Sequence, residues 1–278
     1  MDRQPVVCFH TLGDTNLKRA EDASVFVPPW LVGVLDGAKA PFGDNMRPGP
    51  QSPTQRLVSV AVAACHLAGP GTDLPSLARE INRRIRETLG VGGAEDPAAF
   101  PSATFALGRV TDSGGLEILQ GADSLIAIEF SDGSHWATPN TVFRHTSEFL
   151  EAMKGIEPKS ERWHEVRAEV LPAIQGRINK PGGWPMLNGD DAVEQYWLHR
   201  AFEPGKVGRV LFFTDGLISL SHSKAMEDAS VVRELFRTYD DRGFEGIYES
   251  TRQEAMRSSD GRKPYVGEAT AVALNMNT

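Results

Sequence analysis

Two apolar runs that each end in Asp-Gly are the features that most constrain how this chain folds. They are residues 31–38 (LVGVLDGA) and residues 209–217 (RVLFFTDGL). Asp-Gly after an apolar run is also typical of a β-turn, in which Asp caps the turn and Gly takes a positive φ. Neither copy is followed directly by a second alternating strand, as a two-residue hairpin requires. Each copy alone leaves the turn interpretation open, whereas the pair predicts two strands that bring Asp36 and Asp215 to one place.

A second pair of acids is expected at the same sheet edge as Asp36. Glu21 and Asp22 close a polar segment and precede a strand predicted over residues 23–27, and Pro28-Pro29 separates that strand from the one predicted over residues 31–35. In an antiparallel hairpin the start of one strand lies beside the end of the next. The sequence therefore places Glu21 and Asp22 next to Asp36.

The order of the remaining predicted elements indicates the fold class. Further strands are predicted over residues 6–11, 103–110, 116–120, 125–130, 135–138, 210–213 and 270–276. Helices are predicted over residues 53–67, 73–89, 148–179, 193–202, 225–239 and 244–257. The three strands within residues 103–130 are joined by turn signals and predict an antiparallel meander. This order is no repeating βαβ pattern, so we predict an α+β fold with a largely antiparallel sheet system covered by helices.

Composition excludes several classes of function. The chain has 278 residues, which suits one large domain or two small ones, and a formal net charge of −8, which predicts no general attraction to nucleic acid or to anionic membranes. No stretch approaches the roughly 18 apolar residues of a membrane span, and the apolar run at the N-terminus is too short for a signal peptide. Cys8 and Cys65 lie in apolar surroundings and are predicted to be buried free thiols. We therefore expect a cytoplasmic protein that binds neither nucleic acid nor membrane.

Acidic residues at predicted strand ends indicate where chemistry takes place. They are Glu21, Asp22, Asp36, Asp123, Asp215 and Glu268. Converging carboxylates repel one another and raise one another's pKa unless a cation lies between them. Oxygen ligands without a matching His or Cys cluster favour magnesium or manganese over zinc. Two such ions activate a water and hold a phosphate for in-line attack, so these acids predict phosphoryl transfer without a covalent nucleophile.

Five segments, in order along nearly the whole chain, resemble the motifs of the metal-dependent protein phosphatases, the type 2C or PPM family of serine/threonine phosphatases. They are Glu21-Asp22-Ala23-Ser24, Val34-Leu35-Asp36-Gly37, Ala122-Asp123-Ser124, Phe213-Thr214-Asp215-Gly216-Leu217 and Gly267-Glu268-Ala269-Thr270. The resemblance implies a single domain over residues 1–278, with a central β-sandwich between helical layers (αββα) and a helical flap inserted at about residues 140–190. It also implies a divergent bacterial-type enzyme that hydrolyses phosphoserine or phosphothreonine in protein substrates.

The same resemblance implies a role for each acid in binding two Mn²⁺ or Mg²⁺ ions. Asp36 would bridge both ions, the Gly37 carbonyl would bind one of them, and Asp215 would bind the second. Glu21 and Asp22 would hold an ion directly or through water. Asp123 would serve a third, weaker ion, and Glu268 would close the site.

Substrate contacts are also implied by the resemblance. The family binds phosphate through an arginine that precedes the acidic pair, and Arg19 or Lys18 fits that role here. The flap segment carries Trp184 in a glycine- and proline-rich loop, and we expect this loop to border the substrate. The expected catalytic set is Asp36, Asp215, Glu21 and Arg19.

Two departures from the family pattern favour an alternative. Asp36-Gly37 is followed by Ala38, where the family has His or Met. In the closing motif Gly267 takes the first acidic position and Glu268 the second, and strand alternation would turn Glu268 to the opposite face. The alternative function is a catalytically impaired relative that acts as a binding or regulatory module. The seven histidines are scattered and are predicted to be structural or exposed.

Overall fold

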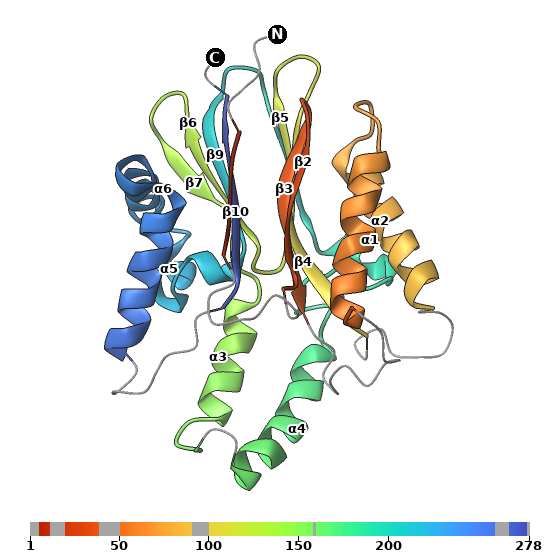
Figure 1. Cartoon of the computed structure of the whole chain (residues 1–278), viewed down its shortest axis with the longest axis vertical. Coiled ribbons are helices and arrows are strands. Elements are labelled where there is room, and N and C mark those ends of the chain that lie inside the picture. The colour runs from red at the N-terminus through yellow and green to blue at the C-terminus, as the bar shows by residue number, and fades with distance from the viewer. Residues whose placement is uncertain are drawn as a thin grey trace.

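Two antiparallel sheets stacked face to face form the centre of the protein, and helices cover the outer face of each sheet (Figure 1). The computed structural model describes residues 6–11, 20–38, 51–90, 100–157, 160–258 and 267–276. One sheet has the strand order β1-β10-β9-β6-β7 and the other has the order β2-β3-β4-β5-β8. The predicted α+β sandwich between helical layers is confirmed, whereas the single domain over residues 1–278 stays a prediction.

The described elements run as follows. The strands are β1 (Val6–Thr11), β2 (Asp22–Val27), β3 (Leu31–Ala38), β4 (Ser102–Val110), β5 (Leu116–Gly121), β6 (Leu125–Phe130), β7 (His135–Ala137), β8 (Leu198–Phe202), β9 (Val207–Phe213) and β10 (Ala269–Asn275). The helices are α1 (Pro53–Leu67), α2 (Leu74–Leu89), α3 (Phe143–Ala152), α4 (Glu161–Gln175), α5 (Leu220–Ala225) and α6 (Ala229–Ser258), with short 3-10 turns η3 (Asp191–Gln195) and η4 (Asp215–Leu217).

Side chains alternate along each strand between two separate cores. On β3, Val32 and Val34 face the second sheet and join a buried cluster that includes Phe212. Leu31 and Leu35 face the other way and pack beneath α1 and α2. Alternation therefore directs the side chain of Asp36, two residues after Val34, into the space between the sheets.

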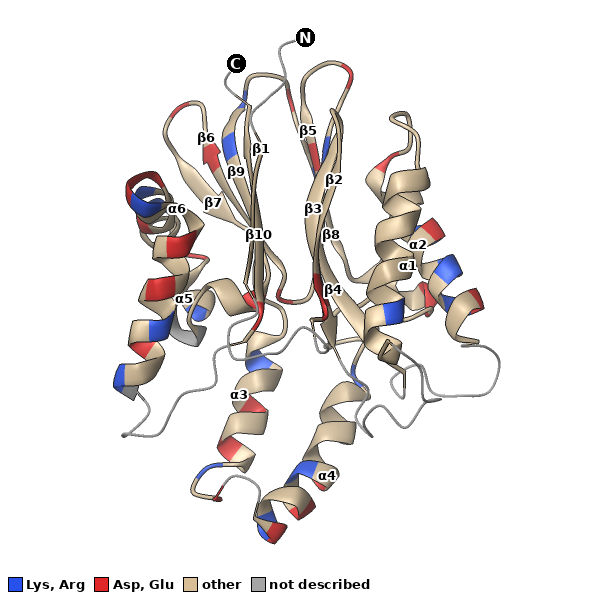
Figure 2. Ribbon diagram, viewed as in Figure 1, with Lys and Arg blue, Asp and Glu red and all other residues tan. Residues whose placement is uncertain are grey.

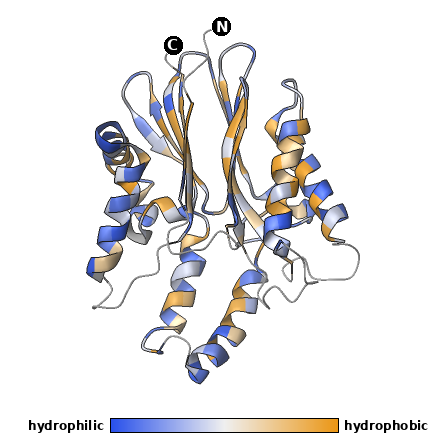
Figure 3. Cartoon of the chain, viewed as in Figure 1, coloured by the Kyte–Doolittle hydropathy of each residue, from blue (hydrophilic) through white to orange (hydrophobic). Residues whose placement is uncertain are grey.

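The helices are fixed by their termini as well as by their apolar faces. Ser52 and Gln55 form a reciprocal capping box at the start of α1, and Pro53 occupies its first turn. Asp73 caps α2, which ends at Gly90 in the left-handed conformation. Figure 3 shows hydrophobic residues concentrated in the strands and hydrophilic residues along the outer surfaces of the helices. No helix in the described part of the chain is both long enough and apolar enough to cross a membrane.

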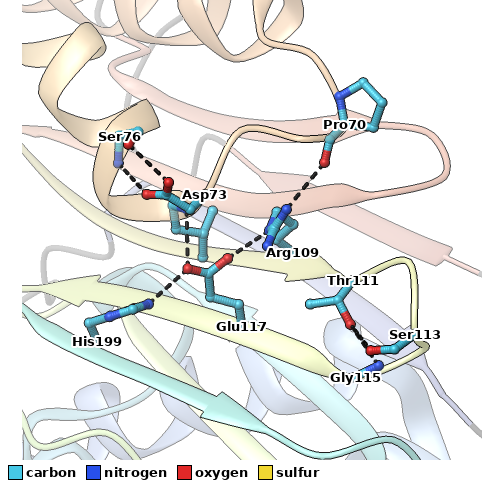
Figure 4. A network of polar contacts seen from close by, with 10 residues as sticks. Pro70, Asp73, Ser76, Arg109, Thr111, Ser113, Gly115, Glu117 and His199 are labelled. Atoms are coloured by element: carbon cyan, nitrogen blue, oxygen red, sulfur yellow. Dashed lines mark hydrogen bonds and ion pairs between the residues drawn. The ribbon is translucent and has the colours of Figure 1, made fainter.

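A polar network fastens α2 to the outer face of its sheet (Figure 4). The carboxylate of Glu117 on β5 accepts hydrogen bonds from Arg109 Nε at 2.6 Å and from the Leu74 amide at 3.3 Å. Its Oε1 also lies 2.8 Å from His199 Nε2 on β8. Glu117 is 5% exposed, so these partners satisfy a carboxylate that would otherwise be costly to bury. The network thereby links β4, β5, β8 and the first turn of α2.

Two of the predicted helical segments are wrong. Residues 193–202 are not a helix, because η3 ends at Gln195 and Leu198–Phe202 pairs with β5 as strand β8. The free edge of β5 and the contact between His199 and Glu117 outweigh the helix propensity of that stretch. Residues 148–179 are not one continuous helix either, because Gly155 has a φ of 74° between α3 and α4.

Two further predictions are corrected by the sheet topology. The strands within residues 103–130 do not form one meander: β4 pairs with β5, whereas β6 lies in the other sheet between β7 and β9. The turn at residues 121–124 therefore carries the chain from one sheet to the other. Cys8 is exposed and not buried, because β1 is an edge strand, whereas Cys65 is buried as predicted.

The close approach of the two sheets makes a prediction about Gly108. A Cβ at Gly108 would lie 2.3 Å from the ring of Phe212, which is fully buried between the sheets. We expect Gly108→Ala to lower the free energy of unfolding by about 1–3 kcal/mol, because overpacking forces strand or ring to move. Urea denaturation measures the effect. Gly69→Ala is the control, because nothing lies within 4 Å of its added Cβ, and equal stability of the two variants would contradict the prediction.

Candidate functional site

The predicted acids gather at one end of the sandwich. Asp22 opens β2 and lies directly opposite Asp36 near the end of β3. Asp215 follows the end of β9, and Asp123 lies in the turn between β5 and β6. Glu268 immediately precedes β10, which runs antiparallel to β9. Figure 2 shows acidic segments at this end of both sheets. Antiparallel pairing thus brings together residues from five distant segments, and this end is called the acidic end below.

Asp36 and Gly37 belong to a strand and not to a β-turn. Both lie within β3, where Asp36 pairs with Asp22 on one side and with Thr104 on the other. A Cβ at Gly37 would lie 2.5 Å from the Thr54 side chain and 2.9 Å from the Glu21 carbonyl. Glycine is needed at this position because α1 and the start of β2 approach the strand closely.

Asp215-Gly216 has a different local structure. Asp215 opens the 3-10 turn η4 directly after β9. A Cβ at Gly216 would lie 1.8 Å from the Glu268 carbonyl oxygen, so only glycine allows the two chain segments to meet. This contact brings the start of β10 against the residue that follows Asp215.

Buried hydroxyl groups separate the acidic end from the apolar core between the sheets. Thr214 Oγ1 donates a 2.7 Å hydrogen bond to Asp22 Oδ2 across the sandwich, and accepts one of 3.0 Å from the Thr270 amide. The hydroxyls of Thr104 and Ser124 lie 2.6 Å apart and also link the two sheets. These four side chains are between 0% and 4% exposed. They supply polar partners where the carboxylates meet the core.

Burial, together with neighbouring carboxylates, raises the pKa values of Asp22, Asp36 and Asp123. The pKa of Asp22 is raised to about 7 by burial first and by the charge of Glu268 second, although its hydrogen bond from Thr214 acts in the opposite direction. Burial followed by the charge of Asp215 raises the pKa of Asp123 to about 8. Burial and the neighbouring aspartates also hold the pKa of Asp36 well above its usual range.

Solvent moderates these interactions unevenly. Asp22, Asp36 and Asp123 are half-buried, whereas Asp215 is exposed. Desolvation of the Asp215 carboxyl group raises its pKa, and its hydrogen bond to Asp36 acts against this shift. Because the residue as a whole is exposed, solvent screens its charge most. Asp36 is the centre of the group, because Asp22, Asp123 and Asp215 all act on it.

Glu21 and Glu268 lie at the edge of this group and contact each other. Glu21 Oε1 accepts a 3.0 Å hydrogen bond from the hydroxyl of Ser52, the residue that caps α1, so its side chain is directed toward that helix. The Glu21 amide donates a 2.7 Å hydrogen bond to Glu268 Oε2. Strand alternation was expected to turn Glu268 away, but its carboxylate instead reaches β2 and raises the pKa of Asp22.

Some predicted contacts differ from the structure or lie outside it. Arg19 and Lys18 fall outside the described residues. Trp184 is 4% exposed, so its ring is packed inside the flap and offers no surface to a substrate. Sequence reasoning missed His10 on β1, whose Nδ1 lies 2.7 Å from Thr270 Oγ1 and whose Nε2 lies 3.4 Å from Glu268 Oε1. Only the pairing of β1 with β10 reveals this contact, since His10 is directly opposite Thr270.

The donor set at the acidic end fits hard divalent cations in its chemistry. It includes Asp22, Asp36 and Asp123, whose pKa values are raised. Glu268 Oε1 is buried and accepts no hydrogen bond, with His10 Nε2 3.4 Å away. Mg²⁺ and Mn²⁺ take such oxygen ligands. Within the described ranges, however, no three or more His, Cys, Asp or Glu side chains are already arranged to hold an ion. The carboxylate oxygens are thus the ligand type that these cations prefer, and the acidic side chains would have to move to bind an ion.

Comparison with known proteins identifies the fold. The sequence matches no protein-family model and no curated protein. The structure is similar to the serine/threonine phosphatase Stp1 of Staphylococcus aureus, with a TM-score of 0.55 and 14% identity, covering 98% of this chain and 94% of that one. It is also similar to a bacterial serine phosphatase, with a TM-score of 0.54 and 13% identity, covering 99% and 98% of the two chains. The chain thus has the fold of bacterial PPM phosphatases over its full length, as the motifs predicted.

The raised pKa values make the stability of the metal-free protein depend on pH. Between about pH 4 and pH 7, the raised pKa values predict protons on Asp22 and Asp123 in the folded protein that the unfolded chain, with an Asp pKa of 3.8, has released. The contribution of these protonated carboxyl groups to the free energy of unfolding is therefore complete below about pH 4 and is lost as the pH rises through about 7 to 8. We expect the free energy of unfolding in EDTA to fall between about pH 5.5 and about pH 8.5.

Replacing Asp123 isolates its share of this dependence. Asp123→Asn cannot ionise, so the variant should lose less stability over the same range and exceed wild type by about 1–2 kcal/mol at the alkaline end. Urea denaturation at the two pH values measures the difference. Asp112→Asn, in the exposed turn between β4 and β5, is the control and should follow wild type. An Asp123→Asn profile parallel to wild type would contradict the prediction.

Proposed function

We propose that this chain is a metal-dependent phosphatase that hydrolyses phosphoserine or phosphothreonine in protein substrates. The observation that carries the proposal is the convergence of Asp22, Asp36, Asp123 and Asp215 at one end of a PPM-type sandwich. The two phosphatases compared are 14% identical to this chain or less, so their likeness shows the fold alone. The activity is therefore inferred from the acids. We also propose that the protein acts in the cytoplasm, without nucleic acid or membrane partners.

We assign the binding of two Mg²⁺ or Mn²⁺ ions to the acidic end. Asp36 would contact both ions, the Gly37 carbonyl one of them and Asp215 the second. Glu21, Asp22 and Glu268 would complete the site, and Asp123 would serve a third, weaker ion. When bound, the ions would supply an activated water for attack on phosphorus and would neutralise charge on the phosphate. Arg19 is the proposed contact for the phosphate itself.

The surrounding residues prepare the acids for this role. The Thr214 hydroxyl occupies one oxygen of Asp22 and fixes the direction of its carboxylate. Asp36 is fixed by backbone pairing on both sides, so its position costs no ordering of a loop. Burial and the neighbouring aspartates raise the pKa of Asp36, so a cation bound among these carboxylates would favour the charged form that ligates it.

Replacing the central acids should abolish hydrolysis. We expect Mn²⁺-dependent hydrolysis of p-nitrophenyl phosphate, and a loss of at least about 100-fold in kcat/KM for Asp36→Asn and for Asp215→Asn, since each change removes a charged ligand. EDTA should remove the activity, and added Mn²⁺ should restore it. Asp112→Asn is the matched control, because this exposed aspartate belongs to the turn between β4 and β5. Hydrolysis that persists in EDTA or in both variants would refute the proposal.

The altered closing motif supports a second candidate, a binding or regulatory module with the phosphatase fold. Gly267 offers no side-chain ligand, and Glu268 is already engaged by the Glu21 amide and lies beside His10. A site with one ligand fewer would bind ions more weakly. Calorimetry separates the two candidates: binding of two Mn²⁺ ions at micromolar strength supports the enzyme, and absence of binding supports the module.

Glu268→Gln tests whether the closing acid contributes to that binding. The amide oxygen of Gln can still accept the hydrogen bond from Glu21, so we expect the fold and thermal stability to remain close to wild type. The lost negative charge should weaken Mn²⁺ binding by about 10-fold, as measured by calorimetry. Unchanged affinity would show that Glu268 only ties β10 to β2. Glu203→Gln, an exposed glutamate after β8, is the control.

A further inference from the structure

A second cluster lies directly beside the acidic end and belongs to the flap, defined as residues 140–190. The flap is inserted between β7 and β8, and its helices α3 and α4 extend beyond the acidic end of both sheets (Figure 1). Its buried apolar core consists of Ile174, Ile178, Trp184, Met186 and Ala122. Ala122 is not a flap residue, because it precedes Asp123 in the turn that crosses between the sheets. The flap core is therefore completed by the neighbour of a proposed metal ligand.

The turn that carries Asp123 is held by contacts with the start of the flap. The carbonyl of Ala122 accepts hydrogen bonds from the amide and from the hydroxyl of Thr141, each at 3.3 Å. It also accepts one of 2.8 Å from Gln120 Nε2. Ala122 has a φ of 67°, a conformation that costs energy for a residue with a side chain and persists only where the surroundings impose it. Ala122 is held both by these hydrogen bonds and by its burial in the flap core.

Contacts that involve His145, Arg177 and Glu148 hold Trp184 in the buried cluster that includes Ala122. The rings of Trp184 and His145 lie 4.5 Å apart, and His145 is 3% exposed. Arg177 Nη1 donates hydrogen bonds to His145 Nδ1 at 2.9 Å and to Glu148 Oε2 at 2.6 Å. These contacts join α3, the end of α4 and the tryptophan loop into one unit.

The loop after Trp184 is attached to β4 at the same end. Leu187 and Ala103 exchange two backbone hydrogen bonds of 2.9 Å. Ala103 in turn pairs with Gly37 in the sheet. Ala38, the residue after Gly37, packs against the flap core as well. The flap thus contacts two segments that carry proposed metal ligands, Asp36 on β3 and Asp123 in the turn.

We propose that Trp184 and Arg177 are positioning residues, which seat the flap on Ala122 and thereby fix the turn that carries Asp123. The catalytic consequence of this proposal rests on the proposed phosphatase function. The packing of the flap on Ala122 does not depend on that function. Trp184 acts through the buried cluster that includes Ala122 and not through the substrate, because its side chain is 4% exposed. The prediction that Trp184 borders the substrate is accordingly replaced by a role behind the site.

Hydrogen exchange followed by mass spectrometry tests the seating without any need for activity. We expect Trp184→Leu and Arg177→Met to accelerate exchange about 10-fold or more in the peptide that spans residues 119–126, because the turn loses its support. Trp184→Phe keeps an aromatic ring on Ala122 and should remain close to wild type. Trp163→Leu is the matched control, since Trp163 lies on α4 in contact with His164 and Arg167 and outside the flap core. Faster exchange confined to residues 143–190 would overturn the proposal.

Kinetics test the consequence for the reaction. Misplacement of the turn should lower kcat about 10-fold on p-nitrophenyl phosphate and on a phosphopeptide alike, with KM changed less than about 2-fold. A rise in KM for the phosphopeptide alone would overturn the positioning role and indicate direct substrate contact. If the wild-type protein hydrolyses neither compound, the proposed function fails, while the exchange experiment still decides whether the flap supports the turn.

Discussion

Repulsion among carboxyl groups is the constraint around which the acidic end of this sandwich is built. Asp22 lies opposite Asp36 because β2 and β3 pair in a fixed register, so the two acids cannot separate without breaking the sheet. Their pKa values rise in response, and hydroxyl groups lie between them and the apolar core. A sheet that only had to be stable would place apolar residues at these positions. The structure retains this costly arrangement, and that observation supports the proposed cation site.

Local geometry explains why much of the fold could be predicted from the sequence. The hairpin of β2 and β3 follows from two short apolar runs separated by Pro28-Pro29, and its register then determines that Asp22 lies beside Asp36. Likewise, the predicted start of the helix at residue 53 is confirmed, because it depends on Ser52 and Pro53, which lie within or next to its first turn.

Long-range contacts explain the errors. Strand β8 has no strong strand signal of its own and forms because β5 has a free edge. Strand β6 joins the second sheet because the two sheets stack on each other. The turn residues before β6 carry no information about that stacking, so the sequence could not predict it. The acids themselves could be found from the sequence, because they lie at the ends of predicted strands. The directions in which the side chains of Glu21 and Glu268 point could not be predicted, because they depend on long-range contacts. The contact of His10 likewise required the pairing of β1 with β10, which joins opposite ends of the chain.

The closing motif shows how one position can be filled from its neighbour. On β10, Val272 belongs to the core between the sheets, and Thr270 supports Thr214 from the same row. Side chains two residues apart on a strand face the same side, so Glu268 faces the same side as Thr270 and Val272, whereas Gly267 lies on the opposite side. A carboxylate at residue 268 therefore enters the space between the sheets, and the length of Glu brings it to the Glu21 amide and close to Asp22. The carboxylate of Glu268 thus lies at the acidic end although residue 267 is glycine.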